Sequence, residues 1–237
     1  SVDEILRRIG DRTDRPLLDV DDPGREVERL LAARREAYGR IPWHIDTTRL
    51  SVQQVAKRVL AIAEADSLSV RYPGGAYEVH IGEGLRHHVG GTLQAAGAPS
   101  GSRVALVSND VVGPLYATDV EGSLRAAGLR PFTCPIPDGE QRKTLATVTS
   151  LYRQFLGGGL DRSGSVLSLG GGVTGDIAGF AAATFMRGVR FAQVPTSLLA
   201  MVDASVGGKT GVDLPEGKNL VGAFKQPDSV IIDPTVL

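Results

Sequence analysis

The chain has 237 residues, of which 26 are Lys or Arg and 27 are Asp or Glu, so its formal net charge is −1 with His neutral. This charge balance excludes the class of strongly basic nucleic-acid-binding domains. A content of 42% hydrophobic residues excludes a chain that is disordered throughout. The single cysteine, Cys134, cannot form an internal disulfide, and the sequence has neither an apolar run of 18 residues nor a basic-then-apolar leader. We therefore expect a cytoplasmic protein with no nucleic-acid or membrane partner.

Glycine divides the chain into two parts. Residues 1–66 contain 3 of the 30 glycines, and residues 67–237 contain the other 27. In the first part, apolar spacing predicts a helix over 25–38, and a capping box of Ser51 and Gln54 predicts a second helix. A short strand is expected at 45–47 and a linker at 65–68. The first part is thus predicted to be a small helical piece.

The second part alternates strand-like and helix-like segments. A turn at Pro73–Gly75 joins two alternating runs that predict a hairpin. The strands expected after it are 104–107, 132–136, 166–169 and 230–232, and the helices are 85–96, 114–127, 144–156 and 177–184. Alternation of this kind predicts an α/β fold with a mostly parallel, Rossmann-like sheet.

A glycine cluster follows the buried strand that ends at Leu169. Gly170, Gly172 and Gly175 satisfy G-x-G-x-x-G, and such a turn lets backbone approach a pyrophosphate at a helix N-terminus. A standard dinucleotide site also has an acid about 20 residues further on. None lies between Asp176 and Asp203, so a tight packing turn remains the alternative.

A second cluster, Gly207–Thr210, resembles the end of a P-loop. The P-loop spacing requires glycine where this chain has Asp203, which rejects that motif. The charged and amide side chains around it suit an anionic, hydroxyl-bearing small molecule, with solvated surface charge as the alternative. They are Asp203, Lys209, Lys218 and Asn219.

Two further groups of residues are less specific. Glu140 could accept hydrogen bonds from ribose hydroxyls with Lys143 one turn on, or the two could mark an ordinary helix start. The four histidines form no metal-ligand spacing, and His87 and His88 are expected on an exposed helix.

The run from Leu169 to Phe224 resembles 3-dehydroquinate synthase, and the likeness extends back through Pro137–Lys143 to cover about residues 68–237. Only the N-terminal, NAD-binding half of that family is matched. The resemblance implies NAD-dependent conversion of 3-deoxy-D-arabino-heptulosonate 7-phosphate, a phosphorylated sugar acid, to 3-dehydroquinate and phosphate in aromatic amino acid biosynthesis. A divalent metal, zinc or cobalt, assists in the family, and its ligands are not expected in this chain.

The resemblance also implies residue roles. The cofactor set comprises Asn109, Glu140, Lys143, Gly171, Gly172, Val173, Asp176, Thr196, Ser197, Leu199, Lys209 and Lys218. The catalytic set comprises Asp203, Lys209, Asn219 and Arg187. Arg187 matches an arginine presented to the neighbouring subunit's substrate, which implies a homodimer. Ser197 stands where the family usually has threonine and keeps the hydroxyl.

Residues 1–66 resemble the tail of shikimate kinase. Arg15 matches a lid arginine over ATP, and Arg34 matches the arginine that holds the shikimate carboxylate, while Glu36 replaces the usual proline. We therefore expect a kinase tail at 1–66 and a synthase NAD-binding domain at 67–237, as a piece of a bifunctional enzyme without kinase activity. A metal-dependent alcohol or glycerol dehydrogenase and a non-catalytic NAD-binding module remain alternatives.

Overall fold

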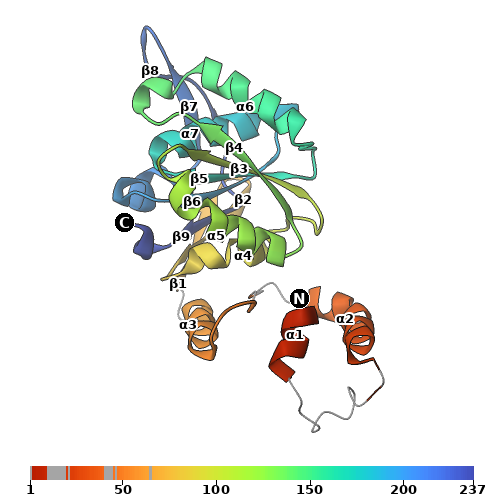
Figure 1. The fold of residues 1–237 in the computed structure, drawn as a ribbon. Coiled ribbons are helices and arrows are strands. Elements are labelled where there is room, and N and C mark those ends of the chain that lie inside the picture. The colour runs from red at the N-terminus through yellow and green to blue at the C-terminus, as the bar shows by residue number, and fades with distance from the viewer. Residues whose placement is uncertain (1, 10–19, 21, 40–44, 46, 64–65) are drawn as a thin grey trace.

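The computed structural model describes residues 2–9, 20, 22–39, 45, 47–63 and 66–237. Its centre is a seven-stranded sheet in the order β1-β2-β9-β6-β5-β3-β4 (Figure 1). The strands are β1 (Asp66–Tyr72), β2 (Gly75–Ile81), β3 (Arg103–Asn109), β4 (Arg130–Ile136), β5 (Ser165–Gly170), β6 (Arg190–Pro195) and β9 (Ser229–Ile232). β1 and β2 form an antiparallel hairpin, and every other pairing is parallel. The predicted hairpin and parallel α/β sheet are confirmed.

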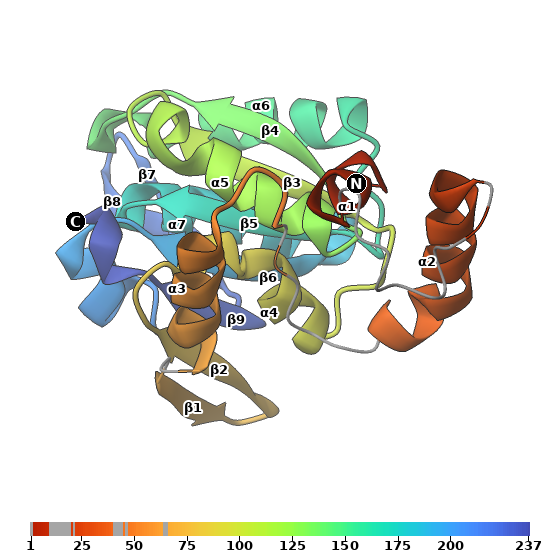
Figure 2. The ribbon, with the colours of Figure 1, turned by 60° about the horizontal axis from the view of Figure 1, so that its bottom comes forward.

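Helices cover both faces of the sheet (Figure 2). The helices that flank the sheet are α4 (Val89–Ala95), α5 (Gly113–Ala126), α6 (Leu145–Gly157) and α7 (Gly172–Thr184). Val104 and Leu106 pack with α4 and α5, whereas Ala105 and Val107 pack with α6 and α7. Alternate residues of a strand point to opposite faces, so a strand buried on both sides reads as a continuous apolar run.

The connections place a crevice at the carboxyl ends of two central strands. β3 pairs in parallel with both β4 and β5. The strand order therefore changes direction at β3: β4 is added on one side of it and β5 on the other. Ligands of open α/β sheets bind at such a switch point. Here it is bordered by Asn109, the last residue of β3, and Gly170, the last residue of β5.

A separate two-stranded ribbon, β7 (Lys209–Leu214) and β8 (Gly217–Phe224), packs on α7. Val212 joins the buried cluster beneath α6 and α7. A Cβ atom at Gly179 of α7 would meet the methyl group of Thr210 and, at 3.0 Å, the ring of Phe191. Glycine at this position therefore lets the ribbon approach the helix.

The N-terminal part is helical where it is described: α1 (Val2–Ile9), α2 (Pro23–Gly39) and α3 (Val52–Ala63). The capping box before α3 is confirmed, because the backbone N–H of Ser51 donates to Gln54 (2.8 Å) and that of Gln54 donates to the Ser51 hydroxyl (3.2 Å). The sequence reading did not anticipate α1. No described helix combines the length and hydropathy that a membrane span requires.

Short turns complete the chain. They are η2 (Leu85–His87), η3 (Glu140–Arg142), η4 (Phe185–Arg187), the π-helical η5 (Ala200–Ala204) and η6 (Pro234–Val236).

Four sequence-based expectations about elements were wrong. The expected helix over 85–96 is broken at His88, because the Asp233 carboxylate accepts the N–H groups of Gly84 and Arg86 and tightens the first turn. His88 is buried, with 1% of its surface exposed. The strand expected at 45–47 is not formed at residues 45 and 47, and residue 46 lies outside the described part. The Thr47 carbonyl accepts a hydrogen bond from the Arg8 side chain and not from a neighbouring strand.

The fourth wrong expectation is the linker at 65–68. β1 already begins at Asp66, because pairing with β2 satisfies its backbone from that residue onward.

Candidate active site

The predicted glycine turn lies at the carboxyl end of β5, where α7 begins directly after Gly171. No side chain caps this helix start, so first-turn N–H groups are left for a ligand or solvent. Two of the glycines serve packing, because a Cβ at Gly170 would lie 2.6 Å from the Thr174 hydroxyl and one at Gly175 would lie 2.6 Å from the Gln193 side-chain oxygen. Gly171 and Gly172 are less confined, because a Cβ would lie 3.4 Å from the Ser197 hydroxyl and 3.2 Å from the Ala204 methyl group, respectively. The packing interpretation is therefore confirmed for Gly170 and Gly175, and the ligand interpretation stays a prediction.

Lys143 lies at the centre of a polar network. Only 4% of this residue is exposed, and its ammonium group contacts the Asp176 carboxylate (2.6 Å) and the Asn219 side-chain oxygen (2.5 Å). Burial raises the pKa of the Asp176 carboxyl, and the hydrogen bond and charge of Lys143 oppose that rise. One buried cation thus links the start of α7 to the β7–β8 ribbon.

Asn219 is held in a left-handed conformation, with φ of 57°. Its backbone N–H donates to the Asp213 carboxylate (2.7 Å), and the Asp213 N–H donates to the Lys143 carbonyl (2.8 Å). Asparagine adopts this conformation more readily than most residues. The ribbon therefore fixes the direction in which the Asn219 amide points, toward Lys143.

Glu140 and Lys143, which lie one turn apart in the sequence, have different partners in the structure. Glu140 accepts a hydrogen bond from Lys218 at 2.9 Å, and this contact raises the pKa of the Lys218 ammonium group. Both partners of this pair are exposed, so a ligand could replace it at little cost.

Asp203 and Lys209 lie at the two ends of a loop that follows η5. Both are exposed, and both line a cleft of about 750 Å³ together with Asp176 and Asn219. The rest of its wall consists of Ala204, Val206, Gly207, Gly208, Thr210, Gly211, Gly222, Ala223, Phe224 and Gln226. The structure therefore brings together four of the residues that the sequence analysis singled out, on a wall rich in glycine.

Three other cofactor candidates, Asn109, Thr196 and Ser197, lie at or just after the carboxyl ends of β3 and β6 and are not among the residues that line this cleft. Asn109 accepts the N–H groups of Val111 and Val112 and donates to Asp138 (2.5 Å), so its amide shapes the loop after β3. Thr196 donates its N–H to the Gly170 carbonyl (3.0 Å), and Ser197 accepts the N–H of Ala200 (3.4 Å).

Three candidates are less integrated. Val173 lies half-buried in the first turn of α7, packed against the cluster beneath α6 and α7. Leu199 is 68% exposed just before η5. Arg187 is exposed on η4 with φ of 69°, and it does not line the cleft.

Of the two kinase-tail arginines, Arg34 lies on α2, and Arg15 lies outside the described residues. Within the described part of the chain, no three His, Cys, Asp or Glu side chains are grouped so that they could hold a metal ion.

Sequence reasoning missed several residues that support the site. Asp213 holds Asn219, the Gln193 amide donates to the Ser205 carbonyl (3.1 Å), and the Tyr77 hydroxyl accepts the Gly207 N–H (2.8 Å). Gln193 and Tyr77 occupy strand positions that look like ordinary core. A buried amide or phenol within an apolar run is the signal that could have identified them, because such groups need partners.

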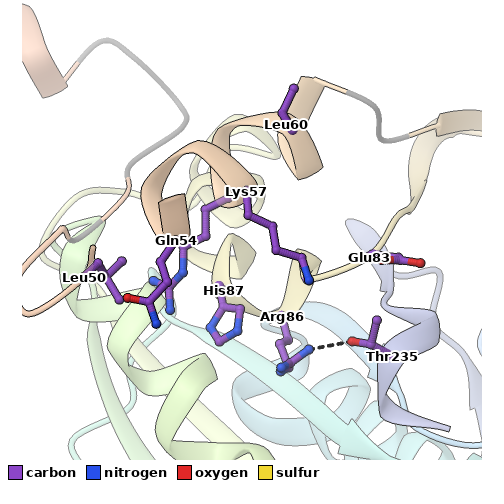
Figure 3. Close-up of a pocket in the computed structure, with 10 residues that line it drawn as sticks. Leu50, Gln54, Lys57, Leu60, Glu83, Arg86, His87 and Thr235 are labelled. Carbon is purple, nitrogen blue, oxygen red and sulfur yellow. Dashed lines mark hydrogen bonds between the residues drawn. The ribbon is translucent and has the colours of Figure 1, made fainter. Parts of the chain in front are cut away.

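A second cleft, of about 450 Å³, lies between α3 and η2 (Figure 3). Lys57 and Gln54 reach into it from α3, and Arg86 faces them from the body of the protein. Arg86 is already engaged by the Asp233 and Asp119 carboxylates, at 2.9 and 3.0 Å. None of the predicted cofactor residues lines this cleft, so the glycine-walled cleft is the candidate active site.

Comparison with known proteins identifies the relatives of both parts of the chain. Residues 133–237 match the family model of the 3-dehydroquinate synthase N-terminal region, and residues 1–64 match that of shikimate kinase. Curated 3-dehydroquinate synthases from Geobacter metallireducens and Latilactobacillus sakei are 49% and 47% identical over 172 and 171 residues. These matches cover 73% and 72% of this chain and 47% and 48% of the relatives. The chain therefore spans about half the length of the curated relatives it matches.

Solved structures show the same fold. A 2-deoxy-scyllo-inosose synthase aligns with a TM-score of 0.67 and 27% identity over 73% of this chain and 48% of its own. A 2-epi-5-epi-valiolone synthase from Streptomyces hygroscopicus, solved with NAD+ and Zn2+, aligns with a TM-score of 0.60 and 29% identity over 70% and 45% of the two chains. The curated relatives show that the chain belongs to the 3-dehydroquinate synthase family, while its residues 1–64 match the shikimate kinase family model.

Proposed function

We propose that this chain provides the NAD-binding half of a 3-dehydroquinate synthase, which converts 3-deoxy-D-arabino-heptulosonate 7-phosphate to 3-dehydroquinate and phosphate. The observation that carries the proposal is the cleft that gathers Asp176, Asp203, Lys209 and Asn219 next to the Gly171 turn. A 2-deoxy-scyllo-inosose synthase solved with carbaglucose-6-phosphate, NAD+ and Co2+ is 26% identical with a TM-score of 0.66, which supports a phosphorylated sugar as substrate class.

NAD fits the residues present. The uncapped start of α7 offers N–H groups to a pyrophosphate, with Gly171 and Gly172 allowing close approach. Glu140 could exchange its hydrogen bond with Lys218 for hydrogen bonds with the ribose hydroxyls. Thr196, Ser197 and Leu199 follow the carboxyl end of β6. Asn109, at the carboxyl end of β3, is assigned to the adenosine. When bound, NAD supplies the hydride chemistry; the residues of this chain bind and orient it.

Lys209 and Asp203 are proposed to act on the substrate. The Lys209 ammonium group, exposed on the cleft wall, stabilises negative charge that develops as phosphate leaves. The Asp203 carboxylate accepts hydrogen bonds from the sugar hydroxyls, and the Asn219 amide exchanges hydrogen bonds with them. Within the described residues, no three His, Cys, Asp or Glu side chains are grouped so that they could hold the divalent metal expected for the family.

We also propose a homodimer and a boundary between the two parts of the chain. Arg187, exposed in a left-handed turn, is proposed to reach the substrate phosphate of a second copy in a homodimer. The boundary between a kinase-derived part, with Arg15 and Arg34, and the synthase part is proposed at residues 66–67.

The test is phosphate release by the enzyme that contains this chain. Lys209→Ala should lower turnover by roughly 10²-fold or more, as loss of one charge-stabilising donor typically does. Lys225→Ala is the matched control, because Lys225 contributes to the same loop only through its backbone N–H, which bonds the Gly208 carbonyl. Turnover within a few-fold of wild type for Lys209→Ala would reject its role, and net NADH accumulation without phosphate release would favour a dehydrogenase.

A further inference from the structure

The loop that carries Lys209 is held from a distant part of the chain. Tyr77 lies on β2, in the hairpin at the edge of the sheet, and is 3% exposed. Its hydroxyl oxygen accepts the backbone N–H of Gly207 at 2.8 Å. Gly207 has φ of 112°, a conformation that only glycine adopts readily. The hydrogen bond therefore fixes a chain reversal two residues before Lys209.

The Tyr77 ring supports the other end of the same loop. The ring belongs to a buried cluster that includes Met201, Val79 and Val230. Met201 lies on η5, two residues before Asp203. The Tyr77 side chain thus shares a buried cluster with the segment that presents Asp203 and bonds the backbone of Gly207, two residues before Lys209.

The loop has few other means of holding its shape. Asp203, Val206 and Lys209 are exposed, so burial of their side chains does not position them. Within the segment, the N–H groups of Ser205 and Val206 bond the Ala200 and Asp203 carbonyls (3.0 and 2.9 Å). The Gln193 amide bonds the Ser205 carbonyl (3.1 Å), and the Lys225 N–H bonds the Gly208 carbonyl (2.7 Å). Gly207 between them depends on the Tyr77 hydroxyl.

We propose that Tyr77 is a positioning residue, whose hydroxyl holds the Gly207 turn so that Lys209 and Asp203 face the cleft together. The ring of Tyr77 contributes to the core, whereas its hydroxyl serves the loop. This inference rests on the proposed function for the roles of Asp203 and Lys209, but the anchor itself can be measured independently.

The experiment compares Tyr77→Phe with wild type, using Tyr72→Phe as a matched control. Tyr72 lies in the same hairpin with its ring centroid 6.3 Å from that of Tyr77, and among the described residues its hydroxyl makes no hydrogen bond to the loop. Amide hydrogen exchange is followed at Gly207 and at Val107, a buried reference in β3. Phosphate release is measured on the enzyme that contains the chain.

Tyr77→Phe should accelerate exchange of the Gly207 amide roughly two- to tenfold, the loss expected for one hydrogen bond, while exchange at Val107 and in Tyr72→Phe stays unchanged. The kcat/KM for phosphate release should fall by a similar factor or more. The inference is overturned if Gly207 exchange is unchanged, if Val107 accelerates in parallel, or if kcat/KM stays at the wild-type value while Gly207 exchange rises. A wild-type enzyme that releases no phosphate would reject the proposed function, whereas Gly207 exchange would still decide the anchor.

Discussion

At the scale of single residues, the buried Lys143 ammonium group takes its two partners from separate elements, Asp176 from α7 and Asn219 from the β7–β8 ribbon. Asp176, Asp203, Lys209 and Asn219 were singled out and line one cleft. The partner of Lys143 was not predictable, because Asp176 and Asn219 reach it only through packing of α7 and the ribbon. Glu140 was nearer in sequence, but the geometry of η3 directs it to Lys218. Spacing along the chain reports local neighbours, whereas buried pairs are set by tertiary contacts.

The buried Lys143–Asp176 pair should make stability depend on pH. Lys143→Met keeps the volume but leaves the Asp176 carboxylate, whose side chain is 25% exposed, without its cation. We expect a loss of about 2 kcal/mol in the free energy of unfolding at pH 8. Since the folded-state pKa of Asp176 is raised, and more so without Lys143, the loss should shrink as pH falls and the carboxyl is protonated.

Urea unfolding at pH 5 and pH 8 measures this effect. Adding Asp176→Asn to Lys143→Met should restore part of the lost stability, because the uncompensated charge is removed. A deficit of equal size at both pH values would show that Lys143 acts through packing alone.

At the scale of elements, the helices and strands around the sheet followed from apolar spacing, and the break in the expected helix over 85–96 lies where one buried carboxylate reorganises the backbone. The carboxylate of Asp233 is fully buried and receives N–H groups from Gly84 and Arg86 as well as the Arg86 guanidinium. A local apolar pattern cannot reveal this, because Asp233 is far away in sequence from the turn it stabilises. The same carboxylate caps η6 through Thr235.

Removing the Asp233 charge should therefore destabilise the protein strongly. Burial alone would raise the pKa of this carboxyl, but hydrogen bonds from Thr235, Gly84 and Arg86 outweigh burial and hold it below 3.8. We expect Asp233→Asn to cost about 3 kcal/mol at pH 7. Because the folded-state pKa is lowered, the wild-type advantage is present above pH 3.8 and is lost as pH falls through the folded-state value.

Thermal unfolding of Asp233→Asn beside Asp119→Asn measures this contribution. Asp119 pairs with the same Arg86 but its side chain is 39% exposed, so its loss should cost about 1 kcal/mol or less. Equal losses in the two variants would mean that the buried hydrogen bonds of Asp233 add nothing to the ion pair.

At the scale of the whole molecule, alternation of strands and helices predicted the parallel sheet, and the glycine turn predicted the edge at which the cleft lies. The β7–β8 ribbon was not predicted, because its glycines and charges read as loop. The exposure expected for the histidine pair was wrong for His88, which is buried with Arg58 of α3 among its neighbours, while His87 lines the cleft between α3 and η2. Packing between the two parts of the chain decides the environment of these side chains.

Burial of His88 should make acid sensitivity a property of the whole fold. Burial, together with the neighbouring charges of His87 and Arg58, lowers the pKa of His88 to about 4, while Asp233 opposes the shift. The unfolded chain, with a His pKa of 6.5, therefore binds one more proton between pH 6.5 and pH 4. Stability should be full above pH 6.5 and fall by about 3 kcal/mol as pH drops to 4.

Urea unfolding across pH 4–8 tests this with His88→Gln, which removes the titrating ring. The variant should lose most of the pH dependence in that window, and the Asp233 contribution should appear only below pH 3.8. His87→Gln is the comparison: burial also lowers the pKa of His87, but its side chain is 17% exposed, so most of the slope should remain. If His88→Gln retains the wild-type slope while His87→Gln abolishes it, the acid-sensitive group is the outer histidine, and His88 is held neutral without consequence for stability.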